Sequence, residues 1–202
     1  MRNPKPRTLT NAPQEVRIIG GQWKRTPLAV PDVPGLRPTP SRVRETLFNW
    51  LGQNLNSWRC IDAFAGTGAL GLEAASRGAA EVVLVEQHNE LVQALKRMVT
   101  RLQAPQVRVE RADALAALTQ RAGQNWDLVF LDPPFAQGEN DPLFRQALAA
   151  ARGAIHPERG LVYLESPREW TQAELQVLGL MPLRQGKAGV VHHALLQAGS
   201  MR

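Results

Sequence analysis

Four consecutive residues near the middle of the chain combine a carboxylate, a rigid turn and an aromatic ring. The largely apolar run 126–131 predicts a buried strand and is followed directly by Asp132, Pro133, Pro134 and Phe135. The prolines restrict the backbone, so this loop needs little ordering when a ligand binds. The Asp132 carboxylate and the Pro133 carbonyl can each accept an N–H bond from an amino nitrogen, and Phe135 offers a face on which a base can stack. The motif therefore fits a site for a flat, amino-bearing group.

A second candidate site is a glycine-rich turn between a predicted strand and a predicted helix. Gly66, Gly68 and Gly71 match the pattern G-x-G-x-x-G, which lets the backbone approach a ligand closely. Glu86 ends the next predicted strand, 20 residues after Gly66, where an acid can accept hydrogen bonds from both ribose hydroxyls. The turn and the acid together indicate a nucleoside-containing cofactor, but they do not distinguish NAD from S-adenosylmethionine. The turn alone also fits a tight connection that binds no ligand.

A third strand is followed by Asp113, which can accept a hydrogen bond from an adenine amino group or cap the helix that begins at residue 114. These two roles are compatible. The lone cysteine, Cys60, excludes an intrachain disulfide and a zinc site built from cysteines. His192 and His193 are adjacent in a predicted strand, where neighbouring side chains point to opposite faces. We therefore expect no metal site.

These candidate residues stand at the ends of strands that alternate with helices. We expect strands at about 59–64, 81–86, 106–110, 126–131 and 160–165, and helices near 69–77, 89–102, 112–121 and 141–151. A short helix is expected near 170–175, and two β-like runs, 177–184 and 189–197, flank 185–188 and predict a closing antiparallel hairpin. The alternation predicts an α/β fold with a mostly parallel sheet and helices on both faces. Ligands bind such sheets at the carboxyl ends of the strands, where the candidate residues lie.

The N-terminal 50 residues differ from the rest of the chain in charge and in composition. The net charge is +6, and this segment holds nine Lys or Arg against three Asp or Glu, so the remainder sums to zero. It also holds eight of the 15 prolines, which excludes long helices. We expect a disordered tail over 1–14, a basic RNA-binding arm with a small β-hairpin over 15–40, and one globular domain over 41–202. The first helix is expected to have Thr39 as its N-cap and Pro40 in its first position.

The composition excludes several classes of protein. With 202 residues and 44% apolar content the chain can bury one sizeable core, so it is neither disordered nor fibrous. No apolar run approaches the roughly 18–20 residues of a membrane span, and no apolar stretch follows the basic N-terminal residues as it would in a secretory signal. A single cysteine fits a reducing compartment. We expect a cytoplasmic monomer without a membrane partner.

The D-P-P-F motif at 132–135 resembles the catalytic motif of class I methyltransferases that modify exocyclic amino groups of bases. The resemblance implies a Rossmann-like fold with a seven-stranded sheet, and S-adenosylmethionine rather than NAD as the cofactor. It implies that Asp132 orients the amino nitrogen and stabilises the positive charge that grows on it. The resemblance implies that Asp62 and the turn of Gly66, Thr67 and Gly68 hold the methionine moiety, Glu86 the ribose, and Asp113 with Ala114 the adenine. Phe64, Ala65 and Gln87 are also implied in cofactor binding.

Longer strings resemble one narrower family. R-I-I-G-G-Q-W at 17–23, R-V-R-E-T-L-F-N-W-L at 42–51 and F-A-G-T-G-A-L-G-L-E-A at 64–74 closely resemble the bacterial small-subunit ribosomal RNA guanine-N2 methyltransferases often called RsmD. The likeness runs from about residue 16 to the end. It implies methylation of N2 of guanine 966 in 16S ribosomal RNA, within the small ribosomal subunit or its assembly intermediates. Ser41 and the pair 87–88 depart from the family pattern, which often has acids there.

The segregation of positive charge favours contact with a polyanion. We expect phosphate contacts from Arg17, Lys24, Arg25, Arg37, Arg42 and Arg44. Two other functions fit parts of the sequence. An adenine-N6 methyltransferase of DNA or RNA also uses D-P-P-F or D-P-P-Y, and a non-catalytic ribosome-assembly factor would keep the fold while binding RNA through the basic arm.

Overall fold

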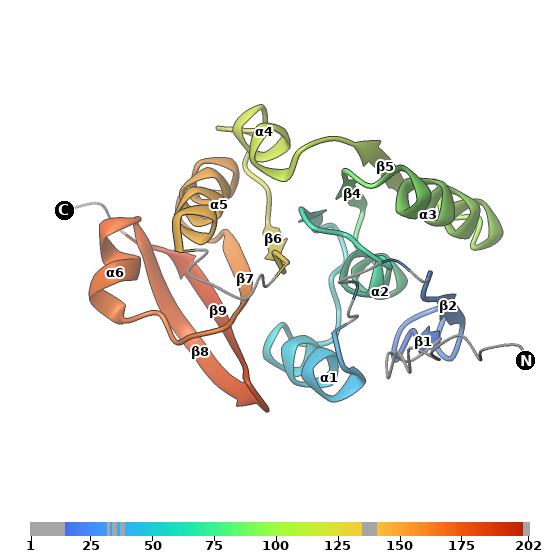
Figure 1. Cartoon of the computed structure of the whole chain (residues 1–202), viewed down its shortest axis with the longest axis horizontal. Coiled ribbons are helices and arrows are strands. Elements are labelled where there is room, and N and C mark those ends of the chain that lie inside the picture. Colours follow the sequence, from blue (N-terminus) through green and yellow to red (C-terminus); the bar gives the residue numbers. More distant parts are fainter. Residues whose placement is uncertain (1–14, 32, 34–35, 37–38, 135–140, 200–202) are drawn as a thin grey trace, which may run out of the picture.

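In the part of the chain that the structure describes, the strands form one sheet of seven and one of two. The computed structural model describes residues 15–31, 33, 36, 39–134 and 141–199, and Figure 1 shows the arrangement of its elements. The larger sheet has the strand order β5-β4-β3-β6-β7-β9-β8. Its strands are β3 (Arg59–Asp62), β4 (Glu81–Glu86), β5 (Val107–Arg111), β6 (Leu128–Leu131), β7 (Leu161–Ser166), β8 (Leu180–Ala188) and β9 (Val191–Ala198).

The pairing of these strands confirms the predicted fold class. β3 pairs in parallel with β4 and with β6, β4 pairs in parallel with β5, and β6 pairs in parallel with β7. β9 is antiparallel to both β7 and β8. The strand order reverses between β3 and β6, and in α/β sheets such a switch point is where ligands bind.

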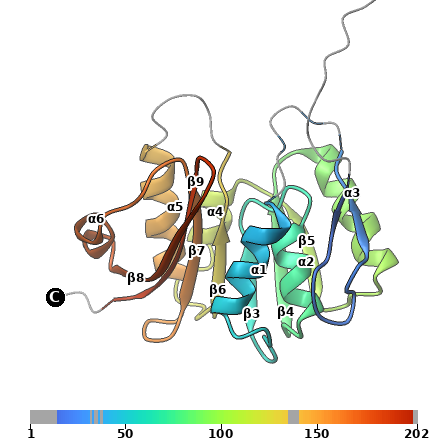
Figure 2. The same cartoon turned by 90° about the horizontal axis from the view of Figure 1, so that it is seen from below.

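Helices cover both faces of the sheet. One face packs against α1 (Ser41–Trp50), α2 (Ala69–Ser76) and α3 (Asn89–Arg101), and the other against α4 (Ala114–Thr119), α5 (Asp141–Ala154) and α6 (Gln172–Val177). Figure 2 shows α1 and α2 side by side in front of the strands. Among the described residues, no helix is long and apolar enough to cross a membrane.

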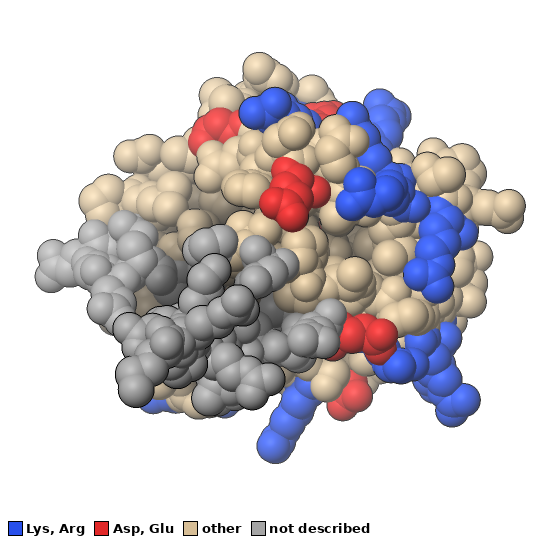
Figure 3. Space-filling view, turned by 45° about the vertical axis from the view of Figure 1, so that its right-hand side comes forward, with Lys and Arg blue, Asp and Glu red and all other residues tan. Residues whose placement is uncertain are grey.

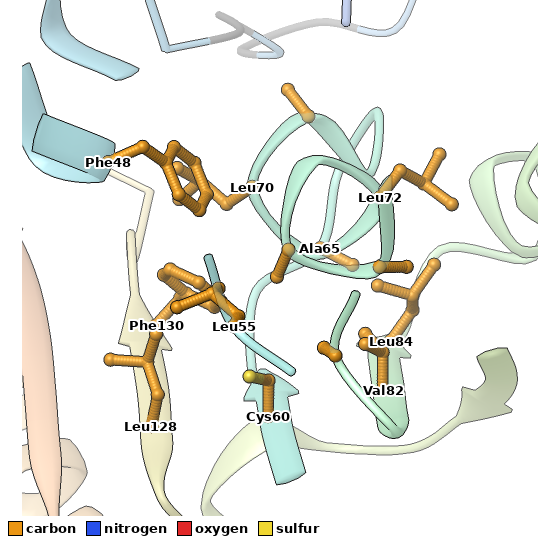
Figure 4. Close-up of a cluster of buried hydrophobic side chains, with 14 of the residues drawn as sticks. Phe48, Leu55, Cys60, Ala65, Leu70, Leu72, Val82, Leu84, Leu128 and Phe130 are labelled. Atoms are coloured by element: carbon orange, nitrogen blue, oxygen red, sulfur yellow. The ribbon is translucent and has the colours of Figure 1, made fainter. Parts of the chain in front are cut away.

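An apolar core beneath α1 and α2 packs these two helices tightly against the sheet. Every residue of α2 is buried, because the helix lies between α1, α3 and the sheet. Phe48 of α1 packs on Phe130 of β6 with the ring centroids 6.4 Å apart. Figure 4 shows these rings with Leu70 of α2 and Cys60 of β3 in one apolar cluster. The strands that lead to the carboxyl ends of β3 and β6 are therefore held in place by a tightly packed core.

The N-terminal hairpin is docked on the end of α2. It consists of β1 (Glu15–Arg17) and β2 (Pro27–Ala29), and its Val16, Ile18 and Leu28 belong to the core under α1 and α2. The Gln22 N–H donates to the Ser76 carbonyl at 2.8 Å. A Cβ on Gly21 would lie 1.8 Å from that carbonyl oxygen, and Gly21 has φ +72°, so only glycine permits this approach.

A buried acid joins the hairpin to the first two helices. Glu73 of α2 has no exposed surface and forms ion pairs with Arg77 at 2.8 Å and with Arg44 of α1 at 3.3 Å. Its Oε2 also accepts the Ile19 N–H at 2.8 Å. The carboxylate therefore satisfies cations and a backbone donor from three separate segments, which fixes the hairpin relative to the sheet.

Two local predictions are wrong. Pro40, not Thr39, is the N-cap of α1, and its side chain has no group that could accept a hydrogen bond from the helix. The Thr39 hydroxyl is directed to another acceptor described below. The closing hairpin turns at 189–190 rather than 185–188, since β8 continues to Ala188. Gly189 has φ +61°, which suits a two-residue hairpin turn better than the residues before it.

Candidate active site

Asp62 and Asp132 stand at the carboxyl ends of the neighbouring strands β3 and β6. Asp62 is level with Phe130, so Asp132 follows two residues further along on the same face. Both aspartates and the glycine turn line one pocket, whose residues are Thr39, Asp62, Phe64, Ala65, Gly66, Thr67, Ala69, Leu70 and Asp132. The structure thus brings the predicted amino-group site beside the predicted cofactor site.

Asp62 is a buried carboxylate with one oxygen unused. The residue is 1% exposed, and its Oδ2 accepts the Gly71 N–H at 2.9 Å. Its Oδ1 is buried without a hydrogen-bond partner among the described residues. Burial, opposed by the backbone N–H groups of Gly71 and Phe64 and reinforced by the charge of Glu86, raises the pKa of Asp62 to about 7. A buried oxygen without a donor is costly, so Asp62 is suited to accept a cationic donor from a ligand.

The glycine turn is hydrogen-bonded to Glu86. Gly68 has φ +78° at the start of α2, a conformation that residues with side chains rarely adopt. At the end of β4, Glu86 Oε2 accepts the Gly66 N–H at 3.0 Å and Oε1 accepts the His88 N–H at 2.7 Å. A carboxylate has about four acceptor positions, so Glu86 can hold the turn and still accept hydrogen bonds from ligand hydroxyls.

The predicted adenine-side residues lie at the start of α4. Asp113 caps this helix, its Oδ1 accepting the Ala116 N–H at 2.9 Å. Asp113 and Gln87 are exposed, whereas Ala114 is buried. Capping leaves acceptor positions free on Asp113, so a contact with adenine stays a prediction that this geometry permits.

Asp132 is held by a residue that lies 93 positions earlier in the chain. The Thr39 hydroxyl donates to Asp132 Oδ2 at 3.3 Å, and Thr39 is 4% exposed. Burial raises the pKa of Asp132, and the carboxylates of Glu165 and Asp62 raise it further. Thr39 leaves the second oxygen, Oδ1, available for another donor, which is the geometry that an amino nitrogen would need.

The rest of the D-P-P-F motif is described only in part. Pro133 is buried and Pro134 is exposed, so the turn leads the chain from the core to the surface directly after Asp132. Phe135 lies outside the described residues, and its stacking role stays a prediction.

Sequence reasoning missed two residues of this site. Thr39 was expected only as a helix cap, and Glu165 of β7 was not considered. Glu165 is 3% exposed and accepts the Tyr163 O–H at 3.0 Å. It occupies the end of an apolar strand just as Glu86 does, so a search for acids at strand ends would have found it. Thr39 carries no comparable signal, because its partner is set by the packing of the segment before α1.

Most of the residues that were expected to bind phosphates, in the arm and at the start of α1, are exposed to solvent. Arg17, Lys24, Arg25 and Arg42 are exposed. The Arg17 side chain is 61% exposed even though it pairs with Glu15 at 2.7 Å. Arg37 lies outside the described residues. Exposed guanidinium and ammonium groups of this kind remain available to phosphates.

Arg44 is not available for the phosphate contact expected of it. The residue is 1% exposed and pairs with Glu73. Its guanidinium also donates to the backbone carbonyls of Thr39 at 3.2 Å and Arg17 at 3.0 Å. The reason is its position on α1, where it faces the buried acid of α2, and a buried acid requires a buried cation.

A second set of cations lies outside the arm. Lys96, Arg97 and Arg101 of α3 and Arg111 of the edge strand β5 are exposed. Within the part of the chain that the structure describes, none of them has a carboxylate within ion-pair distance. Figure 3 shows Lys and Arg side chains following one side of the molecule. The zero net charge of residues 51–202 therefore conceals a basic surface.

A separate hollow lies at the opposite, amino-terminal ends of β3, β4 and β5. Its walls include Arg59, Arg108 and Arg121 with Trp126. Glu81 pairs with Arg59 and Arg108 at 2.7 and 3.1 Å, and Glu110 pairs with Arg121 at 2.6 Å. Since these guanidinium groups already have partners and the hollow is remote from Asp132, it is not the candidate active site.

Comparison with known proteins places the chain in a family. The family described as "Conserved hypothetical protein 95" matches residues 16–197. The chain belongs to this family. Relatives include the "Ribosomal RNA small subunit methyltransferase D" of Escherichia coli, 41% identical over 179 residues that cover 84% of this chain and 88% of the relative. The protein of the same name from Haemophilus influenzae is 37% identical over 187 residues, covering 86% and 94%.

Solved structures of similar proteins share the fold across nearly the whole chain. The structure described as "Putative methyltransferase yhhF from Escherichia coli" has a TM-score of 0.76 at 35% identity and covers 92% of this chain and 98% of its own. The 16S rRNA N2 G1207 methyltransferase of Thermus thermophilus, solved with AdoMet and guanosine, has a TM-score of 0.70 at 22% identity, covering 92% and 50%. At that identity the second likeness shows the fold alone.

Proposed function

We propose that the protein transfers a methyl group from S-adenosylmethionine to the exocyclic N2 of one guanine in 16S ribosomal RNA. The observation that carries this proposal is the shared pocket, in which Asp132 of the D-P-P-F motif lies beside Asp62 and the glycine turn. Membership of a family whose relatives are named as ribosomal RNA small subunit methyltransferases supports the RNA substrate. The choice of guanine N2 and of guanine 966 rests on the family resemblance.

The residues of the pocket fit the proposed cofactor. S-adenosylmethionine supplies an electrophilic methyl group when it is bound. Asp62 Oδ1, buried and without a described partner, suits a cationic amine. The N–H groups at the start of α2 and the left-handed Gly68 allow close approach of a ligand. Glu86 and Asp113 retain acceptor positions for hydroxyl and amino donors.

The chain's own groups then act on the base. The amino nitrogen of guanine is a weak nucleophile because its lone pair is conjugated with the ring. Asp132 and the Pro133 carbonyl each accept one of its N–H bonds, which directs the lone pair and stabilises the charge that develops on the nitrogen. The same Asp132 carboxylate is placed to receive the proton that this nitrogen must release. The Thr39 hydroxyl, which donates to Oδ2, orients this carboxylate.

The substrate must bring a base out of its stack to reach this pocket. Flipping costs least for a guanine that is already in a loop or strained, which favours folded RNA in a small-subunit particle. We propose that Arg17, Lys24, Arg25 and Arg42 bind phosphates of the RNA and that Lys96, Arg97 and Arg101 provide further phosphate contacts. We also propose that the enzyme acts as a monomer in the cytoplasm and needs no metal.

Identification of the methylated nucleoside tests the proposal. Small subunits that lack the modification are incubated with the protein and labelled S-adenosylmethionine, and the digested RNA is analysed by mass spectrometry. We expect label in N2-methylguanosine at a single position. Label in N6-methyladenosine would favour the adenine-N6 alternative. Absence of both label and calorimetric cofactor binding would overturn the proposal and favour an assembly factor.

A further inference from the structure

Glu165 is a buried acid one strand away from Asp132, and the proposed function gives it no role. β6 and β7 are parallel, with Leu131 level with Leu164. The next residues, Asp132 and Glu165, are therefore level with each other and share one face of the sheet. Glu165 is 3% exposed. The strand register thus places two carboxylates side by side at the edge of the pocket.

The groups around Glu165 leave its charge without a cationic partner. Tyr163 donates its O–H to Glu165 Oε1 at 3.0 Å. His193 is level with Glu165 on β9, and burial lowers the pKa of its imidazole, so this group is neutral near pH 7. Arg44 faces the acid from α1 but is paired with Glu73. Among the described residues, no Lys or Arg lies within ion-pair distance of Glu165.

The Thr39 hydroxyl links the two acids. It donates to Asp132 Oδ2 at 3.3 Å, and it also interacts with Glu165 in a way that favours the charged carboxylate. A hydroxyl has one proton and can donate to only one of them at a time. Burial raises the pKa of both acids, and Glu165 raises that of Asp132 more than Asp62 of β3 does.

We propose that Glu165 is a positioning residue that acts on Asp132 through its charge and through Thr39; this inference rests on the function proposed above. The amino nitrogen that gains a methyl group must lose one proton, and the Asp132 carboxylate accepts it before passing it to solvent. The negative charge of Glu165 strengthens this acceptor. Thr39 holds Oδ2, which leaves Oδ1 for the nitrogen.

The pH dependence of methyl transfer tests this role. The single-turnover rate is measured against pH with saturating S-adenosylmethionine and unmethylated small subunits. The fall of this rate at low pH, the acid limb of the profile, reports protonation of Asp132. Glu165→Gln removes the neighbouring charge at nearly constant volume, so we expect the limb to move to lower pH by roughly one unit. The KM for S-adenosylmethionine is expected to change by less than about threefold.

Two further variants make the test independent of how well the first one folds. Thr39→Val removes the hydrogen bond that favours charged Asp132, so the limb is expected to move to higher pH. Tyr163→Phe removes a donor that keeps Glu165 charged, so the limb is expected to move in the direction of Glu165→Gln by a smaller amount. Circular dichroism of each variant checks the fold.

Opposite shifts for the Glu165 and Thr39 variants would support the proposal. A purely structural role would lower the rate equally at all pH values, and a limb that stays in place in all three variants would overturn the inference. If the unmodified protein methylated adenine, the proposed function would be wrong. The acid limb could still be measured with adenine as the substrate, so the role of Glu165 could be tested separately from the identity of the base.

Discussion

Buried or partly buried acids occur in two regions on the same face of the sheet, and they differ in what balances their charge. Glu73, under the hairpin, has no exposed surface and is paired with Arg44 and Arg77. Asp62, Asp132 and Glu165 stand at the carboxyl edge, where no Lys or Arg of the described residues lies within ion-pair distance.

Under the proposed function, this difference separates a structural acid from acids that bind the cofactor or act on the base. A buried carboxylate is stable when cations and hydrogen-bond donors surround it, and costly when they are missing. The Glu73 carboxylate already has two arginines and a backbone N–H as partners, so its charge is balanced without a ligand. At the carboxyl edge Asp62 Oδ1 has no hydrogen-bond partner among the described residues and the charges repel one another, so this region gains most from a cationic ligand. The same change from acid to amide should therefore have opposite effects in the two regions.

The largest effect is expected from Glu73→Gln. The substitution leaves Arg44 and Arg77 buried without their acid, which should lower the free energy of unfolding by about 3–5 kcal/mol. Urea unfolding measures the change. Glu158→Gln, at an exposed position without a described ion pair, is the control and should shift stability by less than about 0.5 kcal/mol. If Glu73→Gln lowered the free energy of unfolding no more than the control does, Glu73 would not be a structural acid.

Asp132→Ala is expected to leave the fold intact and to reduce methyl transfer. Loss of the acceptor for the amino group should lower the single-turnover rate by about 10²–10³-fold. The affinity for S-adenosylmethionine, measured by calorimetry, should stay within about threefold because Asp62 and the glycine turn remain. If this variant instead loses cofactor binding, Asp132 belongs to the cofactor site and not to the base site.

Asp62→Asn should weaken cofactor binding and yet stabilise the ligand-free protein. The amide cannot balance a cationic amine, so affinity for S-adenosylmethionine should fall by about 10- to 100-fold. At pH 8 the variant no longer buries an unpaired charge, and its free energy of unfolding should exceed that of the unmodified protein. Destabilisation of the kind predicted for Glu73→Gln would show that Asp62 is also a structural acid.

The pH dependence of stability sharpens the same contrast. The pKa of Asp62 is raised in the folded protein from 3.8 to about 7, so folding favours the protonated form. Its contribution to stability is fully present below pH 3.8 and is lost as the pH rises through about 7. Urea unfolding between pH 4 and 8 should therefore show a steeper decline for the unmodified protein than for Asp62→Asn. Parallel curves would contradict the assignment.

The smallest effect is expected at the exposed surface. Lys24→Gln combined with Arg25→Gln should weaken binding to small subunits and reduce the salt dependence of log Kd by roughly one unit for each phosphate that is no longer bound. Arg184→Gln combined with Lys187→Gln removes the same charge from the exposed far edge of the sheet and is the matched control. Equal slopes for both double variants would mean that the arm makes no specific interaction with phosphates.

Several features of the site could be predicted from local sequence patterns. The glycine turn at Gly66 and Gly68 and the acids at the ends of apolar runs, Asp62, Glu86 and Asp132, are short-range signals, because a strand, its turn and the next helix are contiguous in the chain. A parallel sheet brings all strand ends to one edge. Their convergence in one region follows from this rule without knowledge of the packing.

Other features depend on pairings between distant segments. The hydrogen bond from Thr39 to Asp132 spans 93 positions, and the ion pair of Arg44 with Glu73 spans 29. Helical periodicity places Arg44 off the apolar stripe of α1 and predicts exposure, because it takes no account of a second helix that buries an acid against it. The neutral sum of residues 51–202 likewise hides the cations of α3, since net charge carries no information on position.

The sequence alone therefore determined the fold class, the glycine turn and the identity of the acids at the strand ends, all of which follow from short-range patterns. Only the tertiary structure decided which acids are balanced. Glu73 is neutralised by Arg44 of α1 and by Arg77 at the C-cap of α2, whereas the strand register sets Glu165 beside Asp132 with no described Lys or Arg within ion-pair distance. The reason is that the charge state and the role of a buried group depend on its neighbours in space, and those neighbours come from segments that are far apart in the chain.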